Sequence, residues 1–363
     1  MLFDYQDRMQ TLMASVDVDA VILVPGANMV YYTGLHFHLS ERPTFAVISK
    51  DGLAMMVPGL ELAKVTARDD LKAKSFAWSD DEGYMGSIKA TITALELGNK
   101  KVGVDGMTMR VFEWLALAEG GINLGTAKDV SESLLLQRAH KTQPEVEAMR
   151  KAIKLSEAAL RDTIEFAKPG MTELQIQEKL VDALSEHDSD AHSFSPIVLT
   201  GPNSALPHGL SGERVLGEDE FLLIDFGGMK DSYPADITRT FCLGTPSNKM
   251  REIYETVLAA NTAAREKAAP GVACKDVDKA ARDVIEAAGY GEYFIHRTGH
   301  GLGLEIHEWP NITSINEMLL EPGMVFTIEP GIYIPDFGGV RIEDNVVITE
   351  TGSESLTSYA RDL

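Results

Sequence analysis

The chain has 363 residues, enough for two domains, and its composition of 44% hydrophobic and 24% charged residues is typical of a globular protein. A formal net charge of -22 argues against binding to nucleic acid or to an anionic membrane, because both require a basic surface. Two cysteines without a CxxC spacing argue against a disulfide framework and against a thiolate zinc site. We find no signal peptide and no apolar run of membrane-spanning length, so we expect a soluble cytoplasmic protein.

The first third of the chain alternates predicted helices with predicted strands. Helices are expected at residues 4–15, 60–68, 84–97 and 109–118, and strands at residues 20–24, 44–49, 53–57 and 101–105. This alternation indicates an α/β domain. We place its end at residues 133–138, so that an N-terminal domain of residues 1–135 precedes a C-terminal domain of residues 136–363.

The segment 34–43 is the most unusual loop of the N-terminal domain, because His36 and His38 lie two residues apart. An ordinary surface loop is the favoured interpretation. The alternative is a loop that faces the substrate and reaches a neighbouring subunit.

The C-terminal domain begins with strong helix signals. Thr142-Gln-Pro-Glu145 is a capping box with a proline just inside the helix, and Thr172 caps a second helix that runs to about residue 186. A second pair of helices is expected at residues 249–268 and 277–288. The hexapeptides 165–170 and 266–271 share Glu, Ala, Pro and Gly at an offset of 101 residues, which indicates an internal repeat.

The two halves also correspond in the segments that come after each helix pair. A histidine comes first, then an apolar strand that ends in an acid, then a second acid. In chain order these residues are His208, Asp225 and Asp236 in the first half, and His300, Glu329 and Glu343 in the second. We therefore expect an internally duplicated α+β domain, with two helix pairs packed on a curved antiparallel sheet. A site on its pseudo-twofold axis would draw residues from both halves.

The first two acids lie within residues 221–241. An apolar run predicts a buried strand that carries Asp225, a glycine turn comes next, and Asp236 precedes a second β-like run that would complete a hairpin. Buried carboxylates that converge repel each other unless a cation lies between them. Taken alone, this stretch fits half of a metal site or two ordinary turn acids equally well.

The second half carries the more explicit pattern. Residues 296–308, HRTGHGLGLEIHE, contain three histidines, together with glycines that allow close backbone approach. A predicted buried strand ends in Glu329, and residues 339–348 alternate so that Arg341 and Glu343 share a face. Singly, such histidines are more often turn residues and such acids are more often caps or ion-pair partners. The equivalent positions of the candidates in the two halves favour a metal site.

Four carboxylates and one imidazole form an oxygen-rich ligand set, which suits Mn²⁺, or else Co²⁺, Fe²⁺ or Zn²⁺. Such a set with bridging carboxylates can hold two ions about 3.5–4 Å apart, which share a water that is nucleophilic at neutral pH. A neighbouring carboxylate would take the proton of that water, and an imidazole would stabilise the oxyanion.

The same residues lie in segments that resemble a known family. The segments IDFGG, ADITRTF, TGHGLGLEIHE, FTIEPGIY and VRIEDNVVIT resemble the signature of the pita-bread (M24) metallopeptidases, strongly over residues 138–363. The N-terminal domain resembles the creatinase/prolidase N-terminal domain more loosely. The resemblance implies that the metal ligands are Asp225, Asp236, His300, Glu329 and Glu343, with Asp236 and Glu343 bridging both ions.

The resemblance also implies roles around the metal ions. Glu329 would accept the proton of the attacking water. His208 matches the family's substrate-side histidine, and His307 matches the one that steadies the tetrahedral intermediate. Arg341 matches a residue that supports the site. His296 has no matching role, and we expect it to be structural.

Among the family members, creatinase is disfavoured because it lacks the metal ligands, and methionine aminopeptidase because it usually lacks an N-terminal domain. The chain looks most like an Xaa-Pro dipeptidase (prolidase), with aminopeptidase P as the runner-up. Such enzymes are commonly homodimers that act on small peptides. Two further alternatives are a relative that acts on a non-peptide substrate and a catalytically silent binding module. The second is disfavoured because no ligand is missing.

Overall fold

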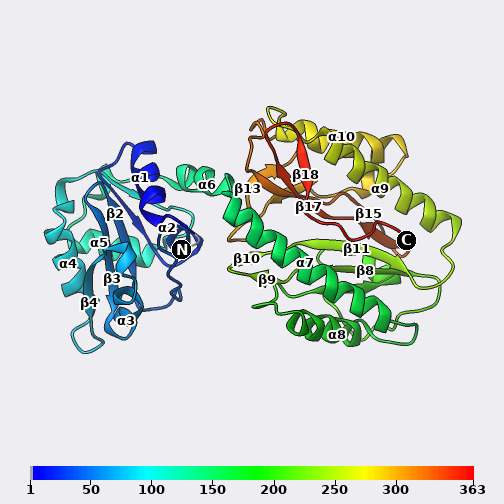
Figure 1. Cartoon of the computed structure of the whole chain (residues 1–363), viewed down its shortest axis with the longest axis horizontal. Helices are drawn as coiled ribbons and strands as arrows, with labels where there is room; N and C mark the ends of the chain where they lie inside the picture. The colour runs from blue at the N-terminus through cyan, green and yellow to red at the C-terminus, as the bar shows by residue number, and fades with distance from the viewer. Residues whose placement is uncertain (1–2) are drawn as a thin grey trace. The chain divides into compact units, whose positions relative to one another are not determined.

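The computed structural model describes residues 3–363, and the chain divides into two compact units, Met1–Arg138 and Ala139–Leu363. Each unit has its own buried apolar core. Figure 1 labels the helices and many of the strands of both units.

The N-terminal unit contains a six-stranded mixed sheet with the strand order β4-β3-β2-β1-β5-β6. The strands are β1 (Ala20–Leu23), β2 (Phe45–Ser49), β3 (Gly52–Pro58), β4 (Lys74–Trp78), β5 (Val102–Val104) and β6 (Lys128–Asp129). The helices are α1 (Tyr5–Ser15), α2 (Ala27–Thr33), α3 (Leu62–Thr66), α4 (Tyr84–Ala94), α5 (Val111–Gly120) and α6 (Ser131–Ala139). The parallel pairs β3–β4, β1–β5 and β5–β6 result from helical crossovers. The predicted α/β class of this domain is confirmed.

Four elements of this unit were absent from the sequence prediction: α2, β4, β6 and α6. Helix α2 is rich in β-branched and aromatic residues, and most of its residues are buried, so it lacks an amphipathic period. Strand β4 is largely exposed at the edge of the sheet and shows no apolar alternation. The segment 34–43 has no regular secondary structure, as expected of a loop.

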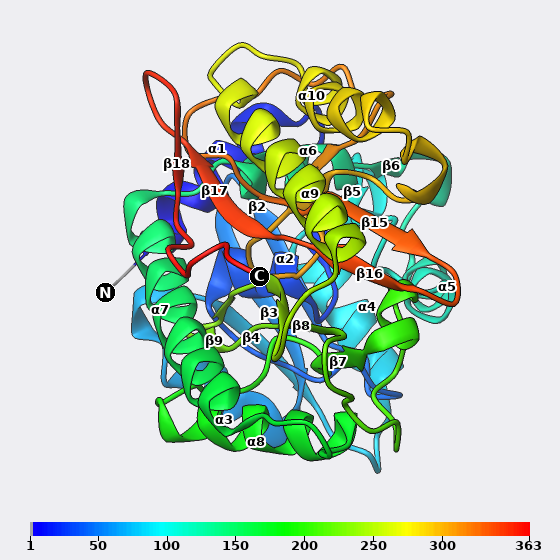
Figure 2. The same ribbon diagram turned by 90° about the vertical axis from the view of Figure 1, so that its right-hand side faces the viewer.

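The C-terminal unit has two helix pairs, as the repeat predicted. They are α7 (Gln143–Phe166) with α8 (Glu173–Glu186), and α9 (Asn248–Lys267) with α10 (Cys274–Ala287). The capping box at the start of α7 is formed, because the Thr142 backbone N–H and hydroxyl both donate to the Glu145 carboxylate, at 2.8 and 2.7 Å. Thr172 forms a second capping box at the start of α8. Figures 1 and 2 show each pair side by side.

The strands of this unit form antiparallel sheets against the helices. The larger sheet has the order β13-β12-β14-β17-β18, the smaller has β11-β8-β7, and β15-β16 and β10-β9 are two-stranded. Their bounds are β7 (Ile197–Thr200), β8 (Phe221–Phe226), β9 (Met229–Lys230), β10 (Tyr233–Pro234), β11 (Ile237–Cys242), β12 (Gly299–Gly301), β13 (Glu308–Ile312), β14 (Val325–Ile328), β15 (Gly331–Ile334), β16 (Gly338–Arg341), β17 (Asp344–Ile348) and β18 (Ser353–Ser355). Helices α7 and α8 pack on β7, β9 and β10, while α9 and α10 pack on β13, β14, β16 and β18. The predicted α+β arrangement is therefore present.

One predicted strand is divided in the structure. The run 339–348 was expected to be continuous, but β16 ends at Arg341 and β17 begins at Asp344, in different sheets. The partner segment breaks at the same level, because β14 ends at Ile328 and β15 begins only at Gly331. Pro330 lies between them and has no N–H to donate, so one continuous ladder cannot form.

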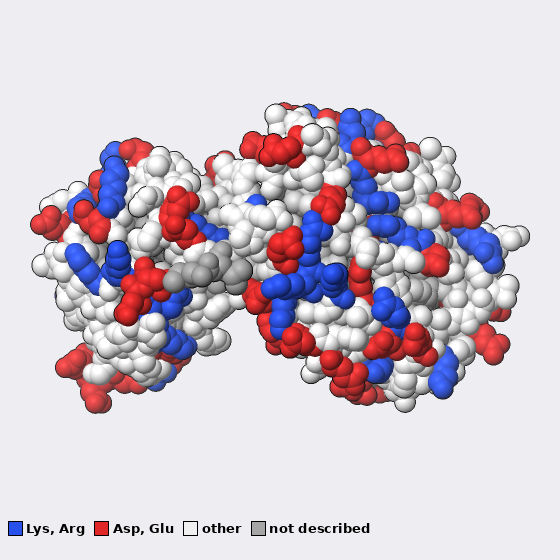
Figure 3. Space-filling view, viewed as in Figure 1, with Lys and Arg blue, Asp and Glu red and all other residues white. Residues whose placement is uncertain are grey.

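Charged side chains of both signs are interspersed on the surface. On the face drawn in Figure 3, Lys and Arg side chains stand beside Asp and Glu on both units.

Within residues 3–363, no helix has both the length and the apolar character that crossing a bilayer requires.

Candidate metal centre

The C-terminal unit contains a cavity of about 620 Å³, and every predicted site residue lines it. These residues are His208, Asp225, Asp236, His300, His307, Glu329, Arg341 and Glu343. They come from segments spread over more than a hundred residues, so the fold brings together what the sequence separates.

The pairing of β8 with β11 places the first two acids. Asp225 lies in β8 opposite Thr238 of β11, and Asp236 precedes Thr238 by two residues. Because side chains two apart along extended chain share a face, Asp225 and Asp236 point to the same side. The two acids are therefore diagonal neighbours, consistent with the hairpin that the sequence predicted.

The other three residues meet on the larger sheet. His300 lies in β12, Glu329 directly follows β14, and Glu343 directly precedes β17. The central strand β14 pairs with both β12 and β17, so the three side chains converge.

The glycines beside His300 are required by the close approach of neighbouring strands. A Cβ on Gly299 would lie 1.8 Å from the Thr327 carbonyl oxygen, and one on Gly301 would lie 2.1 Å from the Trp309 carbonyl oxygen. Thr327 also orients two site residues, because its hydroxyl accepts from the His300 backbone N–H at 3.1 Å and donates to Glu329 at 3.3 Å.

Potential ligand atoms of Asp236, His300 and Glu343 lie within 4.8 Å of one another. The His300 Nε2 atom lies 3.6 Å from an Asp236 oxygen and 3.3 Å from a Glu329 oxygen. One oxygen of Asp225 is bound by Arg341, while the other, Oδ1, is buried and has no hydrogen-bond partner among the described residues. A buried carboxylate oxygen without a donor is costly, and a cation in the cavity would satisfy it.

The protonation of the cluster fits the same interpretation. Burial and the neighbouring carboxylates raise the pKa of Asp236 and of Glu343 well above the ordinary range. Burial raises the pKa of Glu329 to about 7, although the charge of Arg341 opposes the shift. Burial lowers the pKa of His300 to about 3, so its imidazole is neutral, which is the form that binds metal. Four carboxylates in one small volume are thus suited to divalent ions, and the residues fit the predicted group.

Two histidines lie at the edge of the cluster. The ring of His307 packs against the ring of His300 with a centroid distance of 4.2 Å. Burial lowers the pKa of His307, and the nearby charge of Arg297 lowers it further, so this imidazole is neutral. His208 is exposed at the wall of the cavity.

Behind the acids, Arg341 connects several groups. Its guanidinium binds Asp225, donates to the Thr238 hydroxyl at 3.0 Å and donates to the Tyr333 hydroxyl at 2.9 Å. The Thr238 hydroxyl in turn donates to Glu343 at 2.6 Å. His296 lies 2.8 Å from the same Tyr333 hydroxyl, and burial lowers its pKa to about 4.

Sequence reasoning missed three of the polar residues near the site: Thr238, Tyr333 and Arg297. Thr238 lies within the ADITRTF segment, and Tyr333 ends the FTIEPGIY segment, so both were inside the signature without an assigned role. Arg297 lies three residues before His300, and its placement in the cavity depends on the sheet rather than on the spacing.

Comparison with known proteins gives the family. Residues 147–350 match the model of metallopeptidase family M24, and residues 6–140 match that of the creatinase/prolidase N-terminal domain. The chain belongs to metallopeptidase family M24. This membership makes the protein a metal-dependent peptidase that uses divalent ions. It also confirms the predicted fold class, a creatinase-type N-terminal domain followed by a pita-bread domain.

Three similar proteins each match almost the whole chain. The Xaa-Pro dipeptidase of Pyrococcus furiosus is 34% identical over 99% of both chains. The structure of an Xaa-Pro dipeptidase from Bacillus anthracis is similar with a TM-score of 0.91, at 30% identity over 99% of both chains. The structure of an X-Pro aminopeptidase from Thermotoga maritima is similar with a TM-score of 0.86, at 30% identity over 98% of this chain and 99% of that one.

The raised carboxylate pKa values predict how pH affects the stability of metal-free M24 protein. The Glu329 pKa is about 7 in the folded chain against 4.5 for an ordinary glutamate. Between these values the folded state binds more protons than the unfolded state, so the free energy of unfolding contributed by this group falls as pH rises. Asp236 and Glu343 act in the same direction.

Divalent metal should therefore stabilise the protein more at about pH 7.5 than at about pH 5.5, because at the lower pH protons already neutralise the cluster. Differential scanning calorimetry of chelated protein, with and without Mn²⁺, measures the gain in melting temperature at each pH. A larger gain at the lower pH would contradict this account of the cluster.

Proposed function

We propose that this protein is an Xaa-Pro dipeptidase that hydrolyses the bond before a C-terminal proline with the help of two divalent metal ions. The observation that carries the proposal is the buried cluster of carboxylates and one imidazole, in a cavity that the guanidinium of Arg297 also lines. Identity of 34% to an Xaa-Pro dipeptidase over 99% of both chains supports the substrate class.

The residues that would hold the metal ions are Asp225, Asp236, His300, Glu329 and Glu343. The convergence of Asp236, His300 and Glu343 supports this set, as does the Asp225 Oδ1 atom, which has no partner within residues 3–363. The oxygen-rich donors favour Mn²⁺, with Co²⁺, Fe²⁺ or Zn²⁺ as alternatives. When bound, such ions supply a nucleophilic water at neutral pH and polarise the scissile carbonyl.

The other roles in the proposed reaction are proton transfer, stabilisation of the oxyanion, substrate binding and support of the site. Glu329 accepts the proton of the attacking water, and the Thr327 hydroxyl at 3.3 Å holds its carboxylate in place. The neutral imidazole of His307 is an N–H donor for the developing oxyanion, and His208 binds the substrate from the cavity wall. Arg341 supports the site by fixing Asp225.

Arg297 favours dipeptides over longer peptides. It lines the cavity, its guanidinium donates to the Asn311 side-chain oxygen at 2.5 Å, and it forms no ion pair with any residue from 3 to 363. A dipeptide carries its terminal carboxylate directly beside the scissile bond, where a guanidinium can bind it through two hydrogen bonds. The partly buried apolar side chains of Phe194, Ile197 and Ile306 suit the proline ring.

Aminopeptidase P activity is the second candidate, because an X-Pro aminopeptidase shares the fold at 30% identity. Such an enzyme accepts residues after proline and therefore has no need for a carboxylate-binding cation near the scissile bond. A non-peptide substrate is a third candidate, which the same assays test.

We also propose a cytoplasmic homodimer. The N-terminal unit exposes apolar side chains on one face of α5, since Val111 is 71% and Leu115 is 58% exposed, and Met107 nearby is 75% exposed. An apolar surface of this kind is suited to burial against a second copy. Both cysteines are free thiols, as is usual in a reducing compartment.

Metal-dependent release of proline from Ala-Pro and Leu-Pro is the expected activity of chelated protein after addition of Mn²⁺. A Leu-Pro-Xaa tripeptide should be cleaved slowly or not at all, because its carboxylate lies one residue beyond Arg297. Release of the N-terminal residue from the tripeptide at the dipeptide rate would identify an aminopeptidase P. No cleavage of any of these substrates, with metal demonstrably bound, would reject the proline-peptide substrate class.

Replacement of Arg297 by alanine should lower kcat/KM for Leu-Pro by about 10–100-fold, which corresponds to the loss of a charged hydrogen bond. It should leave the slow cleavage of Leu-Pro-amide unchanged, because the amide has no charge to lose. Arg297→Lys should restore part of the activity on Leu-Pro. Equal losses on both substrates would mean that Arg297 has a structural role only.

Light scattering of the intact protein should give twice the mass of one chain. Introduction of charge by Val111→Asp should then weaken the association while the melting temperature of the C-terminal unit is preserved. A monomeric wild-type protein would contradict the proposed dimer.

A further inference from the structure

Three buried polar residues of the signature segments have no role in the proposed metal chemistry. Arg239 follows Asp236 by three residues, and Asp344 and Asn345 directly follow Glu343. Arg239 is 1% exposed, and Asp344 and Asn345 are fully buried. Buried polar side chains need hydrogen-bond partners. For these three residues, several of the partners lie in one short segment, residues 356–361.

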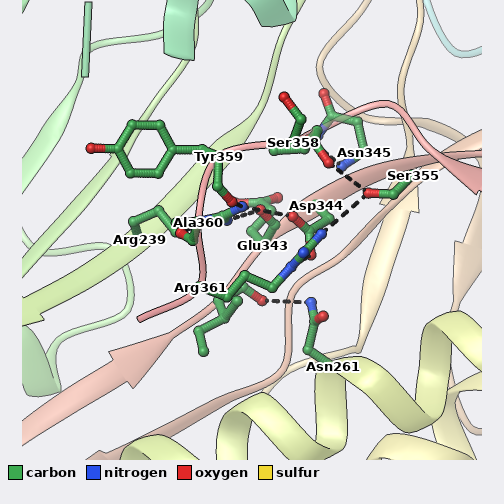
Figure 4. A network of polar contacts seen from close by, with 12 residues as sticks. Arg239, Asn261, Glu343, Asp344, Asn345, Ser355, Ser358, Tyr359, Ala360 and Arg361 are labelled. Carbon is green, nitrogen blue, oxygen red and sulfur yellow. Dashed lines mark hydrogen bonds and ion pairs between the residues drawn. The ribbon is translucent and has the colours of Figure 1, made fainter. Parts of the chain in front are cut away.

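Arg239 uses all five of its N–H donors. Two go to backbone carbonyls beside the metal cluster, those of Thr238 at 2.9 Å and Glu343 at 2.6 Å. One binds the Asp344 carboxylate at 2.8 Å. The last two go to the backbone carbonyls of Tyr359 and Ala360, at 2.9 and 3.0 Å. One guanidinium thus connects the backbone of a proposed metal ligand, Glu343, to residues 359 and 360 (Figure 4).

Asp344 and Asn345 make the same connection from the other sheet. Asp344 binds Arg361 at 2.7 Å as well as Arg239, and Arg265 lies 3.7 Å away. The Asn345 side chain exchanges two hydrogen bonds with the backbone of Asp236. The backbone of Asn345 is in turn bound to the segment, because its N–H donates to the Thr357 hydroxyl and its carbonyl accepts from Leu356.

The segment is also fixed to helix α7. The carboxylate of Glu157 accepts hydrogen bonds from the Ser358 and Tyr359 backbone N–H groups and from the Ser358 hydroxyl, the last at 2.8 Å. Residues 356–361 are therefore held from three directions. Glu157 holds them from α7, and Arg239 and Asp344, the latter through Arg361, hold them from the strands (Figure 4).

The hydrogen-bond network around Arg239, Asp344 and Asn345 lies between two segments that are not paired in one sheet. Asp236 precedes a strand of the smaller sheet and Glu343 precedes a strand of the larger one, and β11 and β17 belong to different sheets. Among the described residues, the backbone–backbone contact between the two segments is the hydrogen bond from the Glu343 N–H to the Thr238 carbonyl at 3.1 Å. The other hydrogen bonds between them involve side chains, such as those of Thr238, Arg239 and Asn345. The carboxylates of Asp236 and Glu343 repel each other, so further contacts are needed to hold the two segments together.

We propose that residues 356–361 form a clamp that fixes Asp236 and Glu343 relative to each other and thereby sets the affinity of the centre for metal. The inference rests on the proposed metal site. Arg239, Asp344 and Asn345 are positioning residues in this view, because they act on the ligands through the backbone. A merely structural role for the segment would change the stability of the fold without changing the affinity for metal.

The test is a calorimetric titration of chelated, full-length protein with Mn²⁺. Glu157→Gln and Arg361→Gln each release one attachment of the clamp, and the double variant releases both. We expect the double variant to bind Mn²⁺ about 10–100-fold more weakly, as is typical when groups that orient metal ligands are lost. Arg361→Lys, which keeps a charge for Asp344, should recover most of the affinity.

Glu354→Gln is the matched control. It removes the ion pair between Glu354 and Arg150 at 2.7 Å, just before the clamp, and touches neither Arg239 nor Asp344. The control should bind Mn²⁺ like the wild type, and circular dichroism and melting curves should show that all variants are folded. Wild-type affinity in the single and double variants would overturn the clamp. Absence of Mn²⁺ binding by the wild type itself would instead overturn the metal site on which the inference rests.

Discussion

The mutual repulsion of four closely placed carboxylates, three of them buried, is the constraint on which the rest of the C-terminal unit depends. Asp225, Asp236, Glu329 and Glu343 line one cavity. Burial raises the pKa of Asp236, Glu329 and Glu343 there, which favours the neutral forms of these three acids. The fold therefore keeps them together at a cost to its own stability, which bound cations would relieve. The helix pairs and sheets supply the compensating apolar core, with residues such as Val257 and Phe326 fully buried.

Much of the fold and of the candidate site could be predicted because the signals are local. The capping box at Thr142 and Glu145 needs only four residues, and the apolar strands before Asp225 and Glu329 need only their own sequences. The same order of one histidine and two acids in both halves related residues about 100 positions apart, which no single helix or strand signal can do. These features indicated two helix pairs, antiparallel strands and an oxygen-rich centre.

The features that escaped prediction depend on contacts between distant segments. The division of the strand at residue 342 results from Pro330 in the partner segment, which no pattern within residues 339–348 records. Arg239 finds its acceptors about 120 residues away, in Tyr359 and Ala360. Helix α2 was missed because burial on most of its surface removes the period by which an amphipathic helix is recognised.

Three arginines near the carboxylate cluster, Arg239, Arg341 and Arg297, differ in their hydrogen-bond and ion-pair partners. These partners indicate which of the three charges are structural and which is available to a substrate. Arg239 has an acceptor for each of its five donors, so it can only hold protein to protein. Arg341 is buried and bound to Asp225, so it balances one of the carboxylates. Arg297 faces the cavity with a single neutral partner, Asn311, among the described residues. A cation in a cavity that the protein itself does not neutralise is best explained by a negative charge that arrives with the substrate, and for a dipeptide that charge is its terminal carboxylate.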